Sequence, residues 1–85
     1  MTYRVVLTKA AGRDIRRTAP EIRERIHSAV LDLEEDPRGQ AEKLSGLQGY
    51  RKRVGNYRVI FDVDDSAREV WVTRVRHRRD AYRRR

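Results

Sequence analysis

The stretch Gly49–Phe61, which reads GYRKRVGNYRVIF, most constrains what this chain can fold into. Within it, Gly55-Asn56 is a two-residue signal for a primed turn between antiparallel strands. The flanking segments Tyr50–Val54 and Tyr57–Val63 are rich in β-branched and aromatic residues, as strands are. The stretch therefore predicts a β-hairpin with a fixed register.

The turn assigns each residue of one strand a partner on the other. Outward from the turn, the expected pairs are Val54 with Tyr57, Arg53 with Arg58, Lys52 with Val59, Arg51 with Ile60, and Tyr50 with Phe61. Successive side chains alternate between the two faces of a sheet. One face then collects the mainly apolar residues Tyr50, Val54, Tyr57, Val59, Phe61 and Val63, and we expect helices to cover it. Lys52 falls on this face, near an edge, with its stem buried and its ammonium reaching water.

The other face of the hairpin brings three arginines together. Arg51, Arg53 and Arg58 share it with Ile60, and no acid lies opposite any of the three in the hairpin. A solvated face with edge-protecting cations is the plain alternative. A guanidinium, however, binds a phosphate group with two parallel hydrogen bonds. The pattern favours a surface for a phosphate backbone.

The remaining elements follow from local patterns. Thr8 is a candidate N-cap for a first helix, and the capping-box spacing of Thr18 and Glu21 indicates the start of a second. The expected elements are a strand at Tyr3–Leu7, helices at Lys9–Arg17 and Pro20–Glu35, a polar loop at Arg38–Gly49, the two hairpin strands, and a last strand at Glu69–Val75.

This order, β-α-α-β-β-β, predicts an α+β fold in a single domain spanning residues 1–85. Two N-terminal helices pack on one face of a small, mostly antiparallel four-stranded sheet. The first strand joins the sheet after the helices cross over, so it pairs in parallel with a later strand.

Charge and cysteine content narrow the function classes. The net charge is +8, and it is uneven: residues 1–49 hold 9 Lys/Arg and 8 Asp/Glu, whereas residues 50–85 hold 12 and 5. Such asymmetry indicates a polyanionic partner, most often nucleic acid. No cysteine is present, and neither histidines nor carboxylates stand at metal-ligand spacing, so we expect no cofactor and no metal site. The chain has no run apolar enough for a signal peptide or a membrane span, which predicts a soluble cytoplasmic protein.

Two segments carry a family resemblance. KLSGLQGYRKRVGNYRVIF (Lys43–Phe61) and RVRHRRDAY (Arg74–Tyr82), in this element order, resemble the RelE family of bacterial toxins within the wider RelE/ParE fold. The resemblance implies the toxin of a type II toxin–antitoxin system that cleaves messenger RNA in the ribosomal A site. It also implies a cognate antitoxin with an acidic amphipathic segment, in a complex that is oligomeric.

The resemblance also assigns roles by position. Arg51 and Arg53 match basic residues of the active-site strand, Arg58 the arginine of the next strand, Arg78 the arginine after the last strand, and Tyr82 the terminal aromatic residue. The predicted catalytic residues are Arg51, Arg58, Arg78 and Tyr82, and the predicted RNA-binding residues are Arg53, Arg76, His77 and Arg79. Arg76 departs from the family, where many members have glycine before a His-Arg pair.

Arginine stays charged, so it suits stabilisation of a phosphorane better than proton transfer. Proton transfer would fall to Tyr82 or to His77. Cations near Tyr82 would lower its pKa, and alternation places His77 on the side of the strand opposite to that of Arg76. Alternatively, Tyr82 stacks on a base of the substrate, or it only caps the edge of the sheet. Two other functions stay open: a ParE-like gyrase inhibitor on the same fold, and a non-catalytic RNA- or ribosome-binding module.

Overall fold

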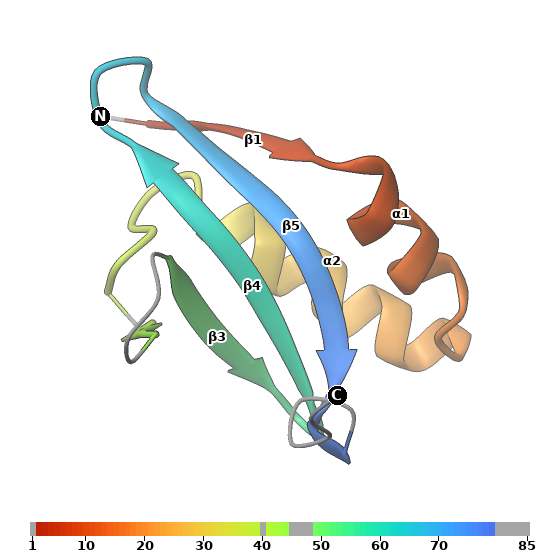
Figure 1. Ribbon diagram of the computed structural model, residues 1–85. Helices are drawn as coiled ribbons and strands as arrows, with labels where there is room; N and C mark the ends of the chain where they lie inside the picture. The colour runs from red at the N-terminus through yellow and green to blue at the C-terminus, as the bar shows by residue number, and fades with distance from the viewer. Residues whose placement is uncertain (1, 40, 45–48, 80–85) are drawn as a thin grey trace.

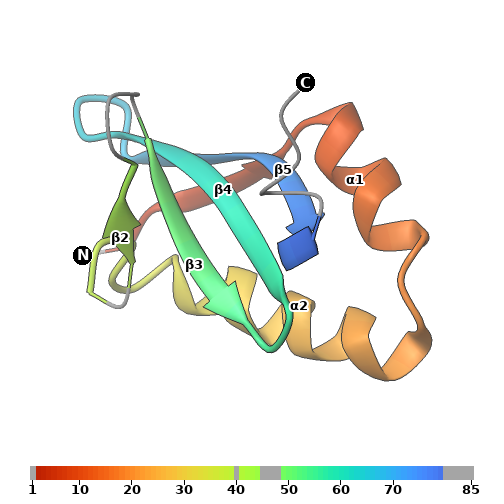
Figure 2. The ribbon, with the colours of Figure 1, turned by 60° about the horizontal axis from the view of Figure 1, so that its bottom comes forward.

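The computed structural model describes residues 2–39, 41–44 and 49–79 of the chain. Its elements are β1 (Arg4–Leu7), α1 (Lys9–Arg16), α2 (Pro20–Asp32), β2 (Glu42–Lys43), β3 (Tyr50–Val54), β4 (Tyr57–Asp64) and β5 (Glu69–His77). The strands form one twisted sheet in the order β1-β5-β4-β3-β2 (Figures 1 and 2). As predicted, β1 pairs in parallel with a later strand, β5, while the other pairs are antiparallel.

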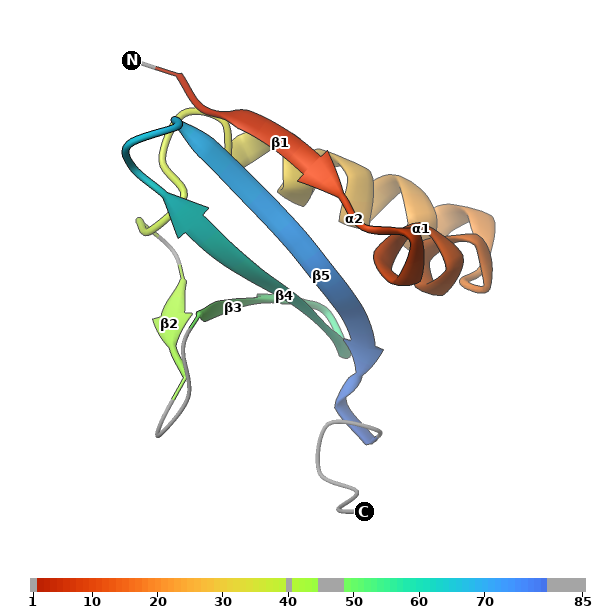
Figure 3. The same ribbon diagram turned by 45° about the horizontal axis from the view of Figure 1, so that its top comes forward.

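Both helices lie on the same side of the sheet, and the described helices leave its other face uncovered (Figures 2 and 3). The core between the two layers is made of the apolar stripe of α2, Ala11 of α1 and alternate residues of the central strands. Its buried members are Ala11, Ile26, Val30, Leu33, Val59, Phe61, Val70, Val72 and Val75. The α+β prediction is confirmed, and we call the uncovered side the open face.

The hairpin has the predicted register at every position, from Val54 opposite Tyr57 to Tyr50 opposite Phe61. Gly55 has a φ of 59°, whereas Asn56 is not among the positive-φ residues. A positive φ at the first central residue alone is typical of a type II′ turn, which favours glycine there. The arginines of β3 and β4 therefore lie on the face that the pattern assigned to them.

The prediction of four strands was wrong by one. The segment expected to be a loop contains β2, whose Glu42 pairs with Arg51 and whose Lys43 pairs with Tyr50. A two-residue strand has too few positions to show alternation, so nothing in its local sequence marks it. The additional strand places an acidic residue beside the arginines.

The helix starts were predicted with mixed success. Thr8 caps α1 as expected, since its Oγ1 accepts a hydrogen bond from the Ala11 N–H at 3.1 Å. The capping box at Thr18 was wrong: Ala19 is the N-cap of α2, and the Thr18 hydroxyl donates to the Ile15 carbonyl at 2.6 Å. Thr18 thus completes the end of the preceding helix instead of starting the next.

Lys52 does lie under the helices, but its ammonium does not simply reach water. The residue is 8% exposed, and Nζ donates to the Ala29 carbonyl at 3.2 Å and lies 3.8 Å from Asp32 Oδ2. Both partners belong to the last turn of α2, where carbonyl groups attract a cation. Lys52 therefore ties β3 to α2 and is structural.

The part of β5 that extends past β1 is hydrogen-bonded to the side chain of Asp14. β1 pairs with β5 only as far as Val72. Beyond it, Asp14 of α1 accepts hydrogen bonds from the Val75 N–H at 2.9 Å and from Arg74 Nε and Nη2 at 2.8 and 3.2 Å. Asp14 thus takes over the role of the missing neighbouring strand at this edge.

Gly49, just before β3, occupies a backbone conformation that other residues rarely adopt. Its φ is 108°, and a Cβ there would lie 2.8 Å from Asp62 Oδ1 and 3.1 Å from the Phe61 carbonyl oxygen. Gly49→Ala is expected to lower the free energy of unfolding by roughly 1–2 kcal/mol, measured by urea denaturation. Gly12→Ala, at a glycine with no positive φ where a Cβ would lie 3.5 Å from Arg16 Nη1, is the control; equal stability of the Gly49 variant and the wild type would contradict the expectation.

Candidate nucleic-acid interface and active site

Two rows of residues cross the open face of the sheet. In the first row, Arg53 of β3 pairs with Arg58 of β4, which pairs with Arg76 of β5. In the second row, Arg51 pairs with Ile60, which pairs with Arg74. Paired residues on one face have Cβ atoms about 4.5–5.5 Å apart. We call this set of five, Arg51, Arg53, Arg58, Arg74 and Arg76, the arginine face.

A β-bulge brings β5 into this arrangement. The pairing of β4 with β5 shifts between Ile60 and Phe61: Phe61 faces Val72 and Ile60 faces Arg74, so Thr73 is the extra residue. Before the bulge, Val70 and Val72 point into the core, and after it Val75 does. Without the extra residue, Arg74 and Arg76 would point to the core side. The spacing of the three valines, two and then three, is the sequence signal of this bulge.

Burial differs strongly along the first row. Arg58 on the central strand is 5% exposed, whereas the Arg53 side chain near the sheet edge is 58% exposed. A buried guanidinium carries its charge in surroundings of low dielectric constant, where its field is stronger than in water. Arg58 is therefore the member of the row that would act most strongly on a bound anion.

A small cavity lies where the row meets the hairpin turn. It has a volume of about 160 Å³, and its lining includes three of the predicted site residues, Arg53, Arg58 and Arg78. The backbone N–H of Arg78 donates to the Asn56 carbonyl at 2.6 Å, which fixes the segment after β5 against the turn. The structure thus brings three guanidinium-bearing residues from three segments around one space.

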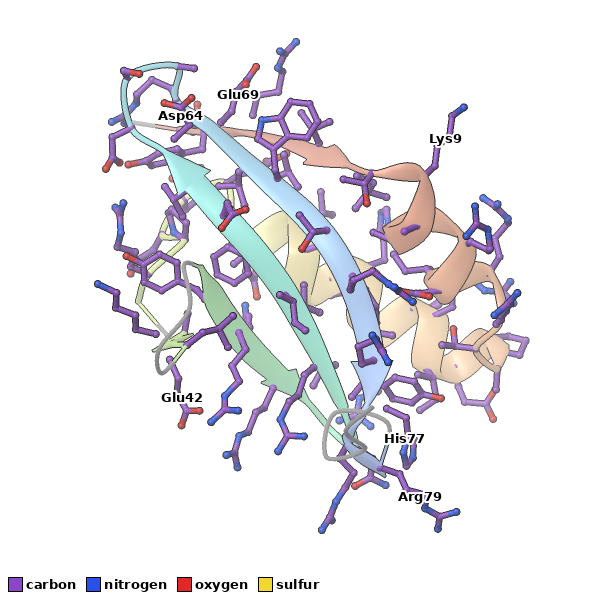
Figure 4. The ribbon with its side chains drawn as sticks, viewed as in Figure 1. Lys9, Glu42, Asp64, Glu69, His77 and Arg79 are labelled. Carbon is purple, nitrogen blue, oxygen red and sulfur yellow. The ribbon has the colours of Figure 1, made fainter. Side chains whose placement is uncertain are left out.

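Glu42 is a residue of this surface that the sequence analysis missed. We expected no acid opposite the three hairpin arginines, but Glu42 Oε1 accepts a hydrogen bond from Arg51 Nε at 2.9 Å and lies 3.7 Å from Arg53 Nη2. The hydrogen bond from Arg51, followed by the charge of Arg53, holds the pKa of the Glu42 carboxyl below its usual range. Glu42 lies at the sheet edge beside β3 (Figure 4).

His77 does not share the face of Arg58 and Arg76. Its ring packs edge-on against Tyr57, with centroids 5.1 Å apart, and its Nδ1 accepts a hydrogen bond from the Arg79 N–H at 3.1 Å. Alternation across Arg76 predicted this side. Arg79 lines a cavity of about 400 Å³ with Asn56, His77 and Arg78. Tyr82 lies outside the described residues.

The far end of the open face carries several acidic residues. Asp62 and Asp64 of β4 and the 40%-exposed Trp71 of β5 line a cavity of about 690 Å³ there. Among the described residues, no three His, Cys, Asp or Glu side chains gather closely enough to hold a metal ion. Asp64 and Glu69 lie at one end of the sheet, and His77 and Arg79 at the other (Figure 4). A polyanion would therefore be attracted to one half of this face and repelled from the other.

Comparison with known proteins decides the family. The sequence profile described as the ParE toxin of the type II toxin–antitoxin system parDE matches residues 5–82. Toxin RelG of Mycobacterium tuberculosis is 34% identical over 89 residues, which cover 99% of this chain and 100% of that protein. The chain belongs to the RelE/ParE family of type II toxin–antitoxin toxins.

Solved RelE/ParE structures agree with this assignment. The toxin–antitoxin complex RelBE2 of M. tuberculosis contains a chain that is 30% identical, with a TM-score of 0.83 over 91% of this chain and 99% of the other. The RelE–RelB complex of Pyrococcus horikoshii gives a TM-score of 0.78 at 26% identity, over 92% and 97% of the two chains. The predicted family and fold class are both confirmed. In the described part of this RelE/ParE chain, no helix is long and apolar enough to cross a membrane.

Proposed function

We propose that this chain is a ribosome-dependent endonuclease that cleaves messenger RNA in the A site and so inhibits translation. The observation that supports this most is the row Arg53–Arg58–Arg76 beside a cavity that Arg78 also lines. Arginine forks in a partly enclosed space bind a phosphate group that carries extra charge in its transition state. The open sheet face gives an extended strand of RNA room to reach them.

The proposed reaction needs no metal. The ribose 2′-OH attacks the adjacent phosphorus, the bond to the 5′-oxygen breaks, and the products are a 2′,3′-cyclic phosphate and a 5′-OH. Arg51, Arg58 and Arg78 stabilise the phosphorane, because their charge is fixed at every working pH. The flanking phosphates bind the cations of the same region, which are the exposed Arg53 and Arg79 and the half-buried Arg76, with His77 at its border.

Tyr82 is the proposed base that takes the 2′-OH proton. Arginines precede and follow Tyr82 in the sequence, and cations close to a tyrosine lower its pKa. His77, by contrast, faces the other side of β5 from Arg58. Tyr82→Phe is expected to lower single-turnover cleavage on programmed ribosomes by about 10²-fold. His77→Gln tests the other candidate base, and less than a fivefold loss is expected from it. Wild-type cleavage by Tyr82→Phe would remove the residue from the mechanism.

The proposal includes a cognate antitoxin. Several solved relatives in the family are toxin–antitoxin complexes, among them RelBE2 of M. tuberculosis and RelE–RelB of P. horikoshii. We expect the antitoxin of this chain to lay an acidic amphipathic segment over its basic surface, in an oligomeric complex. A small acidic protein encoded beside the toxin, which co-purifies with it and stops its activity, would support this part.

A second candidate function is inhibition of DNA gyrase, because the matching profile describes a ParE toxin. One pair of assays separates the two. Purified protein is added to ribosomes programmed with a defined message, and primer extension maps cuts. The same protein is added to gyrase with supercoiled plasmid. Codon-positioned cuts on the ribosome without gyrase-dependent DNA cleavage are expected, and the reverse result would replace the proposal by the second candidate.

A further inference from the structure

Glu42 stands apart from the other acids of the open face, because it alone among the described acids is paired with the arginines of β3. A single oxygen, Oε1, lies 2.9 Å from Arg51 Nε and 3.7 Å from Arg53 Nη2. The other described acids of this face, Asp62, Asp64 and Glu69, lie toward the opposite end of the sheet. The carboxylate therefore occupies donors that a phosphate oxygen would use.

The backbone fixes the place of this carboxylate. Glu42 of β2 is paired with Arg51 of β3. The Glu42 side chain must therefore project over the open face beside Arg51. The loop before β2 is held by Arg38, which donates to both oxygens of Asp65 at 3.2 and 2.8 Å and to the Tyr50 hydroxyl at 3.0 Å. The contact of Glu42 with the arginines is thus built into the sheet.

We propose that the Glu42 carboxylate is a tethered stand-in for a phosphate of single-stranded RNA, and that RNA binds by displacing it from Arg51 and Arg53. This inference rests on the proposed function, since it assumes that the arginine face binds RNA. In the free protein, Glu42 holds the two guanidiniums in place and lowers their attraction for any passing polyanion. On the ribosome, a positioned phosphate replaces the carboxylate.

The chemistry of the carboxylate fits displacement better than proton transfer. Its pKa is held low by Arg51 and Arg53, so it is ionised and a weak base in the free protein. Its side chain is 54% exposed, so it has room to swing into water without leaving a buried charge. Breaking an exposed ion pair costs little, and the exchange is readily reversible.

The test measures binding without catalysis. The full chain is titrated with a fluorescent single-stranded RNA whose 2′-hydroxyls are O-methylated, so it cannot be cleaved by 2′-OH attack. Glu42→Gln is expected to bind this RNA roughly two- to fivefold more tightly than the wild type at low salt, with the difference shrinking at high salt. Asp62→Asn removes the same charge from the same face and is the control, with less change than Glu42→Gln.

A second readout follows the carboxylate itself. The pKa of Glu42, measured by carboxyl-carbon NMR, is expected to rise toward its usual range when the RNA binds, because Arg51 and Arg53 then face phosphate. Weaker or unchanged binding by a folded Glu42→Gln, or an unchanged Glu42 pKa in the complex, would overturn the inference. Primer extension on ribosomes tests the proposed function separately: tighter binding by Glu42→Gln without any ribosomal cleavage by the wild type leaves this inference intact and refutes only the nuclease.

Discussion

Replacing Arg58 with alanine is expected to lower messenger RNA cleavage on programmed ribosomes by about 10²–10³-fold, the usual effect of removing one donor to an oxyanion. Arg58 is 5% exposed at the centre of the row, between Arg53 and Arg76. In the proposed mechanism, its guanidinium would act on the phosphorane from surroundings that screen it less than water does. The loss should appear in the single-turnover rate constant more than in the binding constant.

Two variants separate charge from geometry. Arg58→Lys keeps the cation but loses the fork of donors, and we expect it to recover only part of the lost rate. Arg13→Ala removes an exposed cation from α1 and controls for net charge. Circular dichroism should show that each variant is folded. A folded Arg58→Ala that cleaves at the wild-type rate would refute the assignment of this residue.

Replacing Asp14 with alanine is expected to lower the free energy of unfolding by about 2–3 kcal/mol, and the melting temperature by roughly 10–20 °C. The Asp14 side chain is only 10% exposed, and it accepts hydrogen bonds from the Val75 N–H and from Arg74. Without it, the Val75 N–H loses its hydrogen-bond acceptor, because β1 pairs with β5 only as far as Val72. Thermal unfolding followed by circular dichroism measures the effect, and Asp36→Ala, an exposed acid after α2, is the control.

The Asp14 carboxyl also makes the free energy of unfolding depend on pH in a defined direction. Burial raises the pKa of Asp14, but hydrogen bonds from Arg74 and the Val75 N–H outweigh it and hold the pKa below its usual range. A pKa lower in the folded than in the unfolded chain means that the stabilisation is complete above about pH 4 and is lost as pH falls through the folded value. The stability gap between the wild type and Asp14→Asn should therefore narrow below about pH 4. A gap that widens on acidification would contradict this reading.

Short-range patterns determined much of the site. A primed turn and strict alternation were enough to place Arg51, Arg53 and Arg58 on one face, because both signals lie within a single hairpin. The cap at Thr8 and the apolar stripe of α2 are equally local. The order of elements then left few ways to build the sheet, and the parallel pairing of β1 followed from it.

Only the tertiary structure decided what surrounds these arginines. Asp14 and Val75 are 61 positions apart, and nothing near either residue indicates the hydrogen bond between them. Glu42 joins the surface through a strand too short to have a period, and Arg76 joins it through the bulge at Thr73. A polar side chain next to a loop or past a bulge can face either way by local rules, so its side is set by which strand it pairs with. By itself the sequence determined three arginines on one face; long-range pairing added Arg74 and Arg76 and placed Glu42 against Arg51 and Arg53.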